Sequence, residues 1–320
     1  MPFDFSLVSA PFRMQPGLRR VAQGAAQLTP SAPGGRHLRE KTAVLGRFAP
    51  QALLSLPGFD EAAVLRAIAH EAERVCPDAW CVDATPSGRL RIAAPRLGWA
   101  LEDGHPVGDG DASIGAVLAA LPAARRAAAL LSLAFEEDFA LIDGATATLP
   151  WLAVCLPSRW APESKIGRHF AEVHAPVADN AMLLAASDSL ARLVTGNERW
   201  ERFVWTITAD PRLDQHPARG APAWAETGRA SAETVAAQAW FRHERQTFVP
   251  MADEQRAIFT IRVDSVPLAE AIASDPSAAA RLHAALASMS AAVLAYRGLG
   301  EVREALLAWL AAHATNPPAP

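Results

Sequence analysis

The sequence predicts an α+β fold in which helices flank an antiparallel sheet and a helical region ends the chain. Strand-like runs in the middle of the chain come in pairs around turn residues, which is typical of hairpins. Helical patterns precede and follow these pairs. A regular alternation of strands and helices is missing from the pattern, so a parallel doubly wound sheet is not expected.

The predicted elements follow from local patterns. Asp60 is a plausible N-cap for a helix over 60–75, and Pro122 separates two helices within 112–135. Hairpins are expected over 79–95 around Pro86–Gly88, over 139–160 around Asp143, and over 237–268 with a turn at 251–254. Further helices are expected over 163–173, over 182–194, from Asp275 and over 301–313, with a strand over 202–210.

These elements suggest a division of the chain into four parts. We expect an extended N-terminal arm over 1–50 that packs on the body, and a body over 51–270. C-terminal helices should follow over 271–314, and the proline-rich end over 315–320 should be disordered.

Composition bounds the class of protein. The 320 residues are 51% hydrophobic and 20% charged, which indicates a folded chain rather than a disordered one. A formal net charge of -4 and the lack of a dense Lys/Arg block argue against a nucleic-acid partner. Pro122, Arg125 and Arg126 interrupt the most apolar stretch, so no membrane span is expected.

Three cysteines, at 76, 81 and 155, make a poor disulfide framework, and the start of the chain does not resemble a secretory signal. We therefore expect buried reduced thiols in a cytoplasmic protein. The sequence also carries no GxSxG, HExxH, Walker or GxGxxG motif.

The first stretch with possible chemistry surrounds His174. If 163–173 is helical, Ile166, Phe170, Val173 and His174 share one face, and Pro176 ends the helix. The imidazole would then lie at a helix C-terminus beside an apolar stripe. It can cap the helix or bond a carbonyl in the core, or it can ligate a metal such as iron. His169 should lie on the solvated side of this helix.

The second stretch is the hairpin over 237–268. On a strand, Arg245 and Thr247 face one way and Glu244 and Gln246 the other. Together with Arg242 and Arg262, these residues bring several guanidinium groups near one hairpin, and guanidinium groups bind carboxylates well. The alternative is ordinary cross-strand pairing with Glu244 or Asp264.

These stretches also carry a family resemblance. "LPSRWAPESKIGRHFAEVHAPVADN" and "RHERQTF", followed by "FTIRVDSVPL", resemble motifs of the haem-binding α subunit of the haem-dependent oxidative N-demethylases. "PFRMQPGLRRV" near the N-terminus is similar to the opening of that family. The resemblance spans about residues 10 to 270.

The resemblance implies a PAS-like core that binds haem b, and a monooxygenase that removes a methyl group from a small secondary amine such as dimethylamine with O2. Electrons would come from NADPH through a partner reductase with flavin and an iron–sulfur cluster. The released formaldehyde could pass to a folate-binding subunit.

The resemblance also implies roles for single residues. His174 would be the axial iron ligand, and Lys165, Arg245 and Arg262 would contact the haem propionates or the substrate pocket. Glu244 would be the catalytic residue that orients the amine, or would pair with an arginine. Ala178 departs from the family motif, which leaves the substrate less constrained than the fold. A non-catalytic haem or small-ligand sensor, and an interaction subunit without cofactor, remain alternatives on the same fold.

Overall fold

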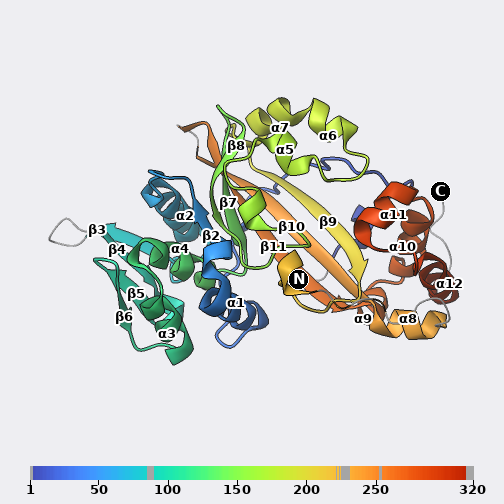
Figure 1. Ribbon diagram of the computed structural model, residues 1–320, viewed down its shortest axis with the longest axis horizontal. Helices are drawn as coiled ribbons and strands as arrows, with labels where there is room; N and C mark the ends of the chain where they lie inside the picture. Colours follow the sequence, from blue (N-terminus) through green and yellow to red (C-terminus); the bar gives the residue numbers. More distant parts are fainter. Residues whose placement is uncertain are drawn as a thin grey trace.

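The computed structural model describes residues 3–84, 90–220, 222, 224, 231–251 and 254–314, and these form an α+β protein (Figure 1). Within them, one antiparallel sheet has the strand order β1-β9-β10-β11-β7-β8-β2. Its strands are β1 (Arg19–Arg20), β2 (Leu53–Ser55), β7 (Asp138–Asp143), β8 (Thr148–Ala153), β9 (Trp200–Thr208), β10 (Trp240–Met251) and β11 (Arg256–Pro267). The predicted α+β class and antiparallel pairing are therefore confirmed.

The β10–β11 hairpin is the longest pairing in this sheet, running from Trp240 opposite Pro267 to Met251 opposite Arg256. It confirms the hairpin expected over 237–268, although residues 252 and 253 of its turn lie outside the described residues. β9 pairs with the other edge of β10. Because side chains alternate along a strand, Glu244 and Arg245 point to opposite faces of the sheet.

Helices cover both faces of this sheet (Figure 1). One face packs against α1 (Arg36–Ala52), α2 (Ala62–Val75) and α4 (Ala123–Ala134), around the buried side chains of Phe139, Leu141, Trp151 and Ile258. The opposite face contributes Ala140, Leu152 and Phe248 to a smaller cluster with Val194. The helices that pack on this opposite face are α5 (Phe170–His174), α6 (Ala181–Ala185) and α7 (Ser187–Val194).

The C-terminal helices pack at the far end of β9 and β10. A cluster around Phe5, Trp205 and Phe241 joins them to the sheet and to the N-terminal segment. These helices are α8 (Ala232–Gln238), α9 (Leu268–Ala273), α10 (Ala278–Ala287), α11 (Ala291–Arg297) and α12 (Arg303–His313). Asp275 accepts a hydrogen bond from the Ser277 backbone at 2.7 Å, so the helix expected from Asp275 begins slightly later than predicted.

A second, four-stranded sheet and α3 (Ala112–Ala120) form a separate layer next to α2 and α4. Its strands are β3 (Cys81–Ala84), β4 (Leu90–Ala94), β5 (Trp99–Glu102) and β6 (His105–Gly108). The expected strands over 79–95 are confirmed, while residues 85–89 of their turn lie outside the described part. The β5–β6 hairpin was not expected. Its turn residues, Asp103 and Gly104, both adopt positive φ, at 53° and 77°, as a tight hairpin turn requires.

Two expected conformations are wrong. The first fifty residues are not all an extended arm, because Arg36–Ala52 form α1 and bury Leu38, Lys41, Val44 and Leu45 at helical spacing. The helix expected over 163–173 is broken: Pro162–Ser164 form a 3-10 turn, Gly167 has φ +69°, and α5 begins only at Phe170. The backbone of Gly167 instead donates to Leu149, so the segment follows the sheet.

Other expectations concern membranes, thiols and the end of the chain. Among the described helices, none is by itself long and apolar enough to cross a membrane. Only α10 and α11, counted together as a bent pair, reach that length and apolar character. All three cysteines are free, with Cys76 and Cys155 buried and Cys81 half-buried. The tail over 315–320 lies outside the described residues.

Candidate functional site

A short helix presents His174 beside the sheet. His169 is the N-cap of α5, and its Nδ1 accepts a hydrogen bond from the Ala171 backbone at 3.2 Å. Glu172 accepts from the His169 backbone in return, which completes a capping box. The other ring nitrogen of His169 lies 3.1 Å from Asp188 on α7. His169 is therefore a cap that joins two helices, while its side chain remains 37% exposed to solvent.

His174 occupies the last position of this helix. Its Nδ1 lies 2.8 Å from the carbonyl oxygen of Phe170, and its ring lies 4.2 Å from the Phe170 ring, centroid to centroid. Nε2 has no hydrogen-bond partner among the described residues. A hydrogen bond from Nδ1–H to a carbonyl leaves the lone pair on Nε2, which is the arrangement of a metal-binding histidine. The carbonyl bond and the metal-ligand role are thus compatible.

The surroundings of His174 favour its neutral form. Burial lowers the pKa of His174, and the positive charges of Arg202 and Lys165 lower it further, while the hydrogen bond to Phe170 acts in the opposite direction. Lys165 is itself held at α5, because its Nζ donates to the carbonyl oxygen of Val173 at 2.7 Å. Lys165 and His174, both expected in the site, are therefore brought together.

Glu244 lies on the face of β10 that also carries Gln246. The residue is only 8% exposed, and its carboxylate accepts hydrogen bonds from Ser158 and, at 2.6 Å, from Gln246. Ser158 accepts in turn from Nε of Arg242 at 2.9 Å. The sequence did not single out Ser158 or Gln246 for this role, although both lie in the stretches that carry the resemblance.

Arg245 and Arg262 lie on the other face of the sheet, directly opposite each other across β10 and β11. Arg245 pairs with Glu201 at 2.9 Å, and Arg262 pairs with Glu136 at 2.8 Å and with Asp264 at 3.6 Å. Cross-strand and local ion pairs thus occupy both guanidinium groups. The sheet separates them from His174, Lys165 and Glu244, so the structure does not gather the five predicted residues into one site.

Arg202 on β9 is a site residue that sequence reasoning missed. It lies opposite Gln246 and therefore shares the face of Glu244. Its Nε is buried without a hydrogen-bond partner, and burial lowers its pKa although Glu244 acts in the opposite direction. The alternation of residues 200–208 could have placed Arg202 on one face of a strand, but not next to His174.

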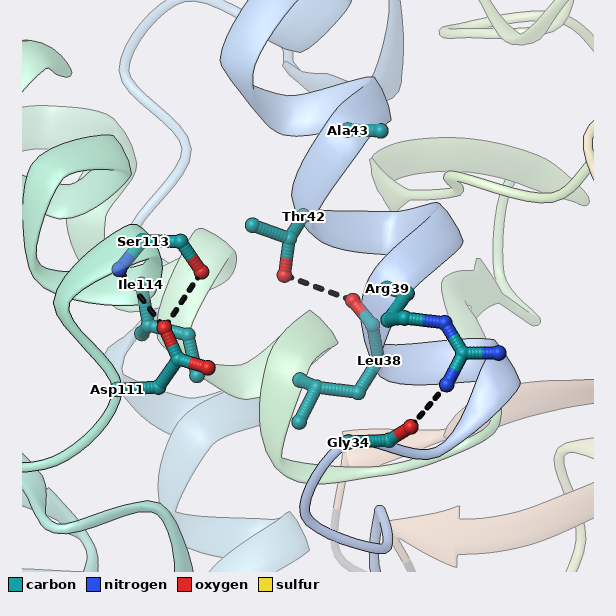
Figure 2. Close-up of a pocket in the computed structure, with 8 residues that line it drawn as sticks. All are labelled: Gly34, Leu38, Arg39, Thr42, Ala43, Asp111, Ser113 and Ile114. Carbon is teal, nitrogen blue, oxygen red and sulfur yellow. Dashed lines mark hydrogen bonds between the residues drawn. The ribbon is translucent and has the colours of Figure 1, made fainter.

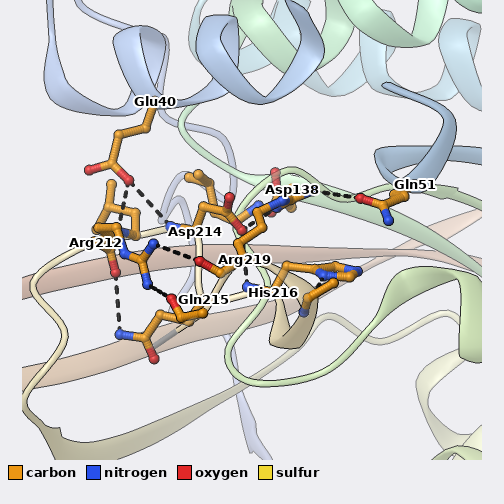
Figure 3. Close-up of polar contacts among 12 residues, drawn as sticks. Glu40, Gln51, Asp138, Arg212, Asp214, Gln215, His216 and Arg219 are labelled. Carbon is orange, nitrogen blue, oxygen red and sulfur yellow. Dashed lines mark hydrogen bonds and ion pairs between the residues drawn. The ribbon is translucent and has the colours of Figure 1, made fainter. Parts of the chain in front are cut away.

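A polar network fixes the loop that holds Arg242 (Figure 3). Arg242 is 1% exposed, and it donates to the carbonyl oxygens of Arg212 at 3.0 Å and Leu213 at 2.8 Å. Glu40 on α1 accepts from the Leu213 backbone at 2.8 Å, and Arg219 pairs with Asp214. This network holds the loop over 209–219 between α1 and β10, and through Arg242 it supports Ser158.

Two adjoining cavities, of about 250 Å³ and about 340 Å³, lie between α1 and the start of α3. Figure 2 shows Leu38 and Thr42 on one side of the first and Asp111 and Ile114 on the other. These volumes are at the small end of ligand pockets, which range over about 300–1,000 Å³. Neither cavity is lined by His174 or Glu244, and no catalytic group gathers there.

Within the described residues, no three His, Cys, Asp or Glu side chains form a group that could hold a bare metal ion. One imidazole is nevertheless sufficient where a porphyrin supplies the remaining ligands. Compared with models of known protein families, residues 115–307 match the family described as haem-dependent oxidative N-demethylase, alpha subunit-like. The match includes His174, Lys165, Arg202 and Glu244.

Proposed function

The chain belongs to the haem-dependent oxidative N-demethylase, alpha subunit-like family, and from this premise we propose that it is a haem-binding oxygenase component. The reaction would be the oxidative removal of a methyl group from a small secondary amine such as dimethylamine, with release of formaldehyde. The single observation that carries the proposal is the neutral imidazole of His174, with Nδ1 engaged and Nε2 open.

The chemistry of His174 fits a residue that would hold the haem iron. The Phe170 carbonyl fixes the orientation and tautomer of the ring, and second-shell bonds of this kind are typical of metal-bound histidines. When bound, haem would supply activation of O2 and oxidation of the N-methyl group. The protein would supply the ligand, a dry surrounding and the position of the amine.

A porphyrin held by His174 would have to lie clear of the packed side of α5. Val173, Ile166 and Trp200 pack into the cluster between these helices and the sheet, so that side of α5 is filled. Successive residues on a helix are about 100° apart, so His174 points away from Val173 and toward a different part of the surface.

Glu244 is proposed to orient the substrate. A secondary amine is a cation at neutral pH, and a buried carboxylate attracts it. Ser158 and Gln246 already hold the Glu244 carboxylate, so it does not need to reorganise when an amine arrives.

The further parts of the proposal concern partners and setting. Alpha-subunit membership implies a multi-subunit enzyme. We propose a reductase chain that carries flavin and an iron–sulfur cluster and takes electrons from NADPH, and a folate-binding subunit that receives formaldehyde. We further propose that the seven-stranded sheet with its helices is PAS-like, and that the protein acts in the cytoplasm.

Turnover tests this proposal. The haem-loaded protein, supplied with O2, an electron donor and dimethylamine, should release formaldehyde and methylamine in equal amounts. Glu244→Gln should retain haem and lose most of this activity. Haem binding with an amine-dependent spectrum, but without formaldehyde from any small N-methylamine, would favour the alternative of a non-catalytic haem sensor. A protein that binds no haem would refute the proposal.

A further inference from the structure

Arg202 lies on the His174 face, and the proposed reaction gives it no role. Four described arginines have a buried Nε without a hydrogen-bond partner: Arg202, Arg219, Arg297 and Arg303. The last three are paired through their other nitrogens, with Asp214, the Trp205 carbonyl and Glu304. No hydrogen bond or ion pair joins the side chain of Arg202 to any described residue, so its guanidinium group has no direct partner.

Nearby groups do not supply the missing partner. Glu244 is near enough to act on the pKa of Arg202, but no hydrogen bond or ion pair joins the two side chains, and the Glu244 carboxylate instead accepts from Ser158 and Gln246. The other charged neighbour of His174 is Lys165, which is also positive. A partly buried guanidinium that has no hydrogen-bond or ion-pair partner is costly, whereas an incoming anion would offset this cost.

A second buried N–H donor on the same face also lacks an acceptor, which supports the binding of an acceptor there. The indole Nε1 of Trp200 is also buried without a partner. Trp200 and Arg202 are two residues apart on β9, so their side chains leave the same face of the strand. Buried N–H donors are normally satisfied, and two adjacent exceptions on one face indicate an acceptor that is bound in the working protein.

We propose that Arg202 is the carboxylate-binding residue of this site. The inference rests on the proposed function, because that function supplies two sources of carboxylate. One is a propionate of the haem, and the other is the acid group of the substrate, which would then be an N-methyl amino acid rather than a simple amine. In the second case Glu244 would bind the amine and Arg202 the carboxylate of the same molecule.

Stability without ligand gives the first test. Arg202→Met removes an unmatched charge, so its unfolding midpoint should equal or exceed that of the unmodified protein. Arg219→Met is the matched comparison, because Arg219 shares the unpartnered Nε but has an ion pair with Asp214. Its midpoint should fall by about 5 °C or more. A comparable fall for Arg202→Met would assign Arg202 a structural role and overturn the proposal.

Binding distinguishes the two sources. If Arg202 binds the propionate, Arg202→Met weakens the binding of iron protoporphyrin IX by about 10- to 100-fold but leaves the binding of its dimethyl ester unchanged. If a substrate acid is bound, porphyrin affinity is unchanged, and the variant loses the spectral response to N-methylglycine while keeping that to dimethylamine. Arg202→Lys should retain part of either effect, and Arg192→Met, an exposed arginine on α7, should show neither.

If the unmodified protein binds no porphyrin, the proposed function fails while Arg202 can still be tested. In that case propionate and N-methylglycine ions should raise the unfolding midpoint of the unmodified protein but not of Arg202→Met. Equal binding of every carboxylate by the two proteins, or no carboxylate effect on either, would overturn the assignment of Arg202.

Discussion

Ser158→Ala should destabilise the protein more than its small change in volume suggests. The Ser158 hydroxyl donates to the buried carboxylate of Glu244 and accepts from Nε of Arg242 at 2.9 Å. Arg242 keeps its bonds to the Arg212 and Leu213 carbonyls, so most of the cost falls on Glu244. A hydrogen bond to a charged group is worth about 1.5–3 kcal/mol, and we expect a total loss of about 2–4 kcal/mol.

Urea denaturation, followed by both circular dichroism and tryptophan fluorescence, measures this loss. Ser164→Ala is the matched control, because its hydroxyl bonds the neutral carbonyl of Ala161 at 2.7 Å at an exposed position. The control should change the free energy of unfolding by about 1 kcal/mol or less. If Ser158→Ala behaves like the control, the link from Arg242 through Ser158 to Glu244 does not hold the carboxylate.

Two further predictions concern titration. Burial lowers the pKa of His243 to about 4, although Asp264 acts in the opposite direction, so protonation favours the unfolded chain. The contribution of neutral His243 to the free energy of unfolding should therefore be fully present above the pKa that this residue has in the unfolded chain. The free energy of unfolding should fall by about 2 kcal/mol from about pH 7.5 to 5. A smaller pH dependence in His243→Gln would confirm that His243 is responsible. Burial raises the pKa of Cys76 to about 11 and that of Cys155 further, whereas Cys81 is half-buried with a smaller rise. Iodoacetamide should thus modify Cys81 first in native protein, and mass spectrometry that found Cys155 modified first would contradict the described packing.

Local patterns were sufficient for much of the fold. The hairpin turn at Asp143 and the helix break at Pro122 have strong sequence signals, and both occur where expected. The alternation on β10 also separated Glu244 from Arg245 correctly. The helix before His174 was mispredicted because apolar spacing alone was followed, although Gly167 permits the left-handed turn that breaks it.

The site could not be assembled from local patterns, because it depends on strand register. Whether Arg262 shares a face with Glu244 or with Arg245 depends on its pairing with β10, and the register places it opposite Arg245. Arg202 meets Glu244 only because β9 pairs with β10, although 42 positions separate them in the chain. Contacts of this kind are set by long-range packing rather than by propensity.

The most direct test of the account is haem binding by His174 variants. The reconstituted protein should show a Soret band typical of histidine ligation. His174→Ala should lose this spectrum and regain it with added imidazole, whereas His169→Ala, which removes the cap of α5 and the contact with Asp188, should keep it. A His174→Ala protein that binds haem with an unchanged spectrum would show that another group holds the iron and would contradict the central claim.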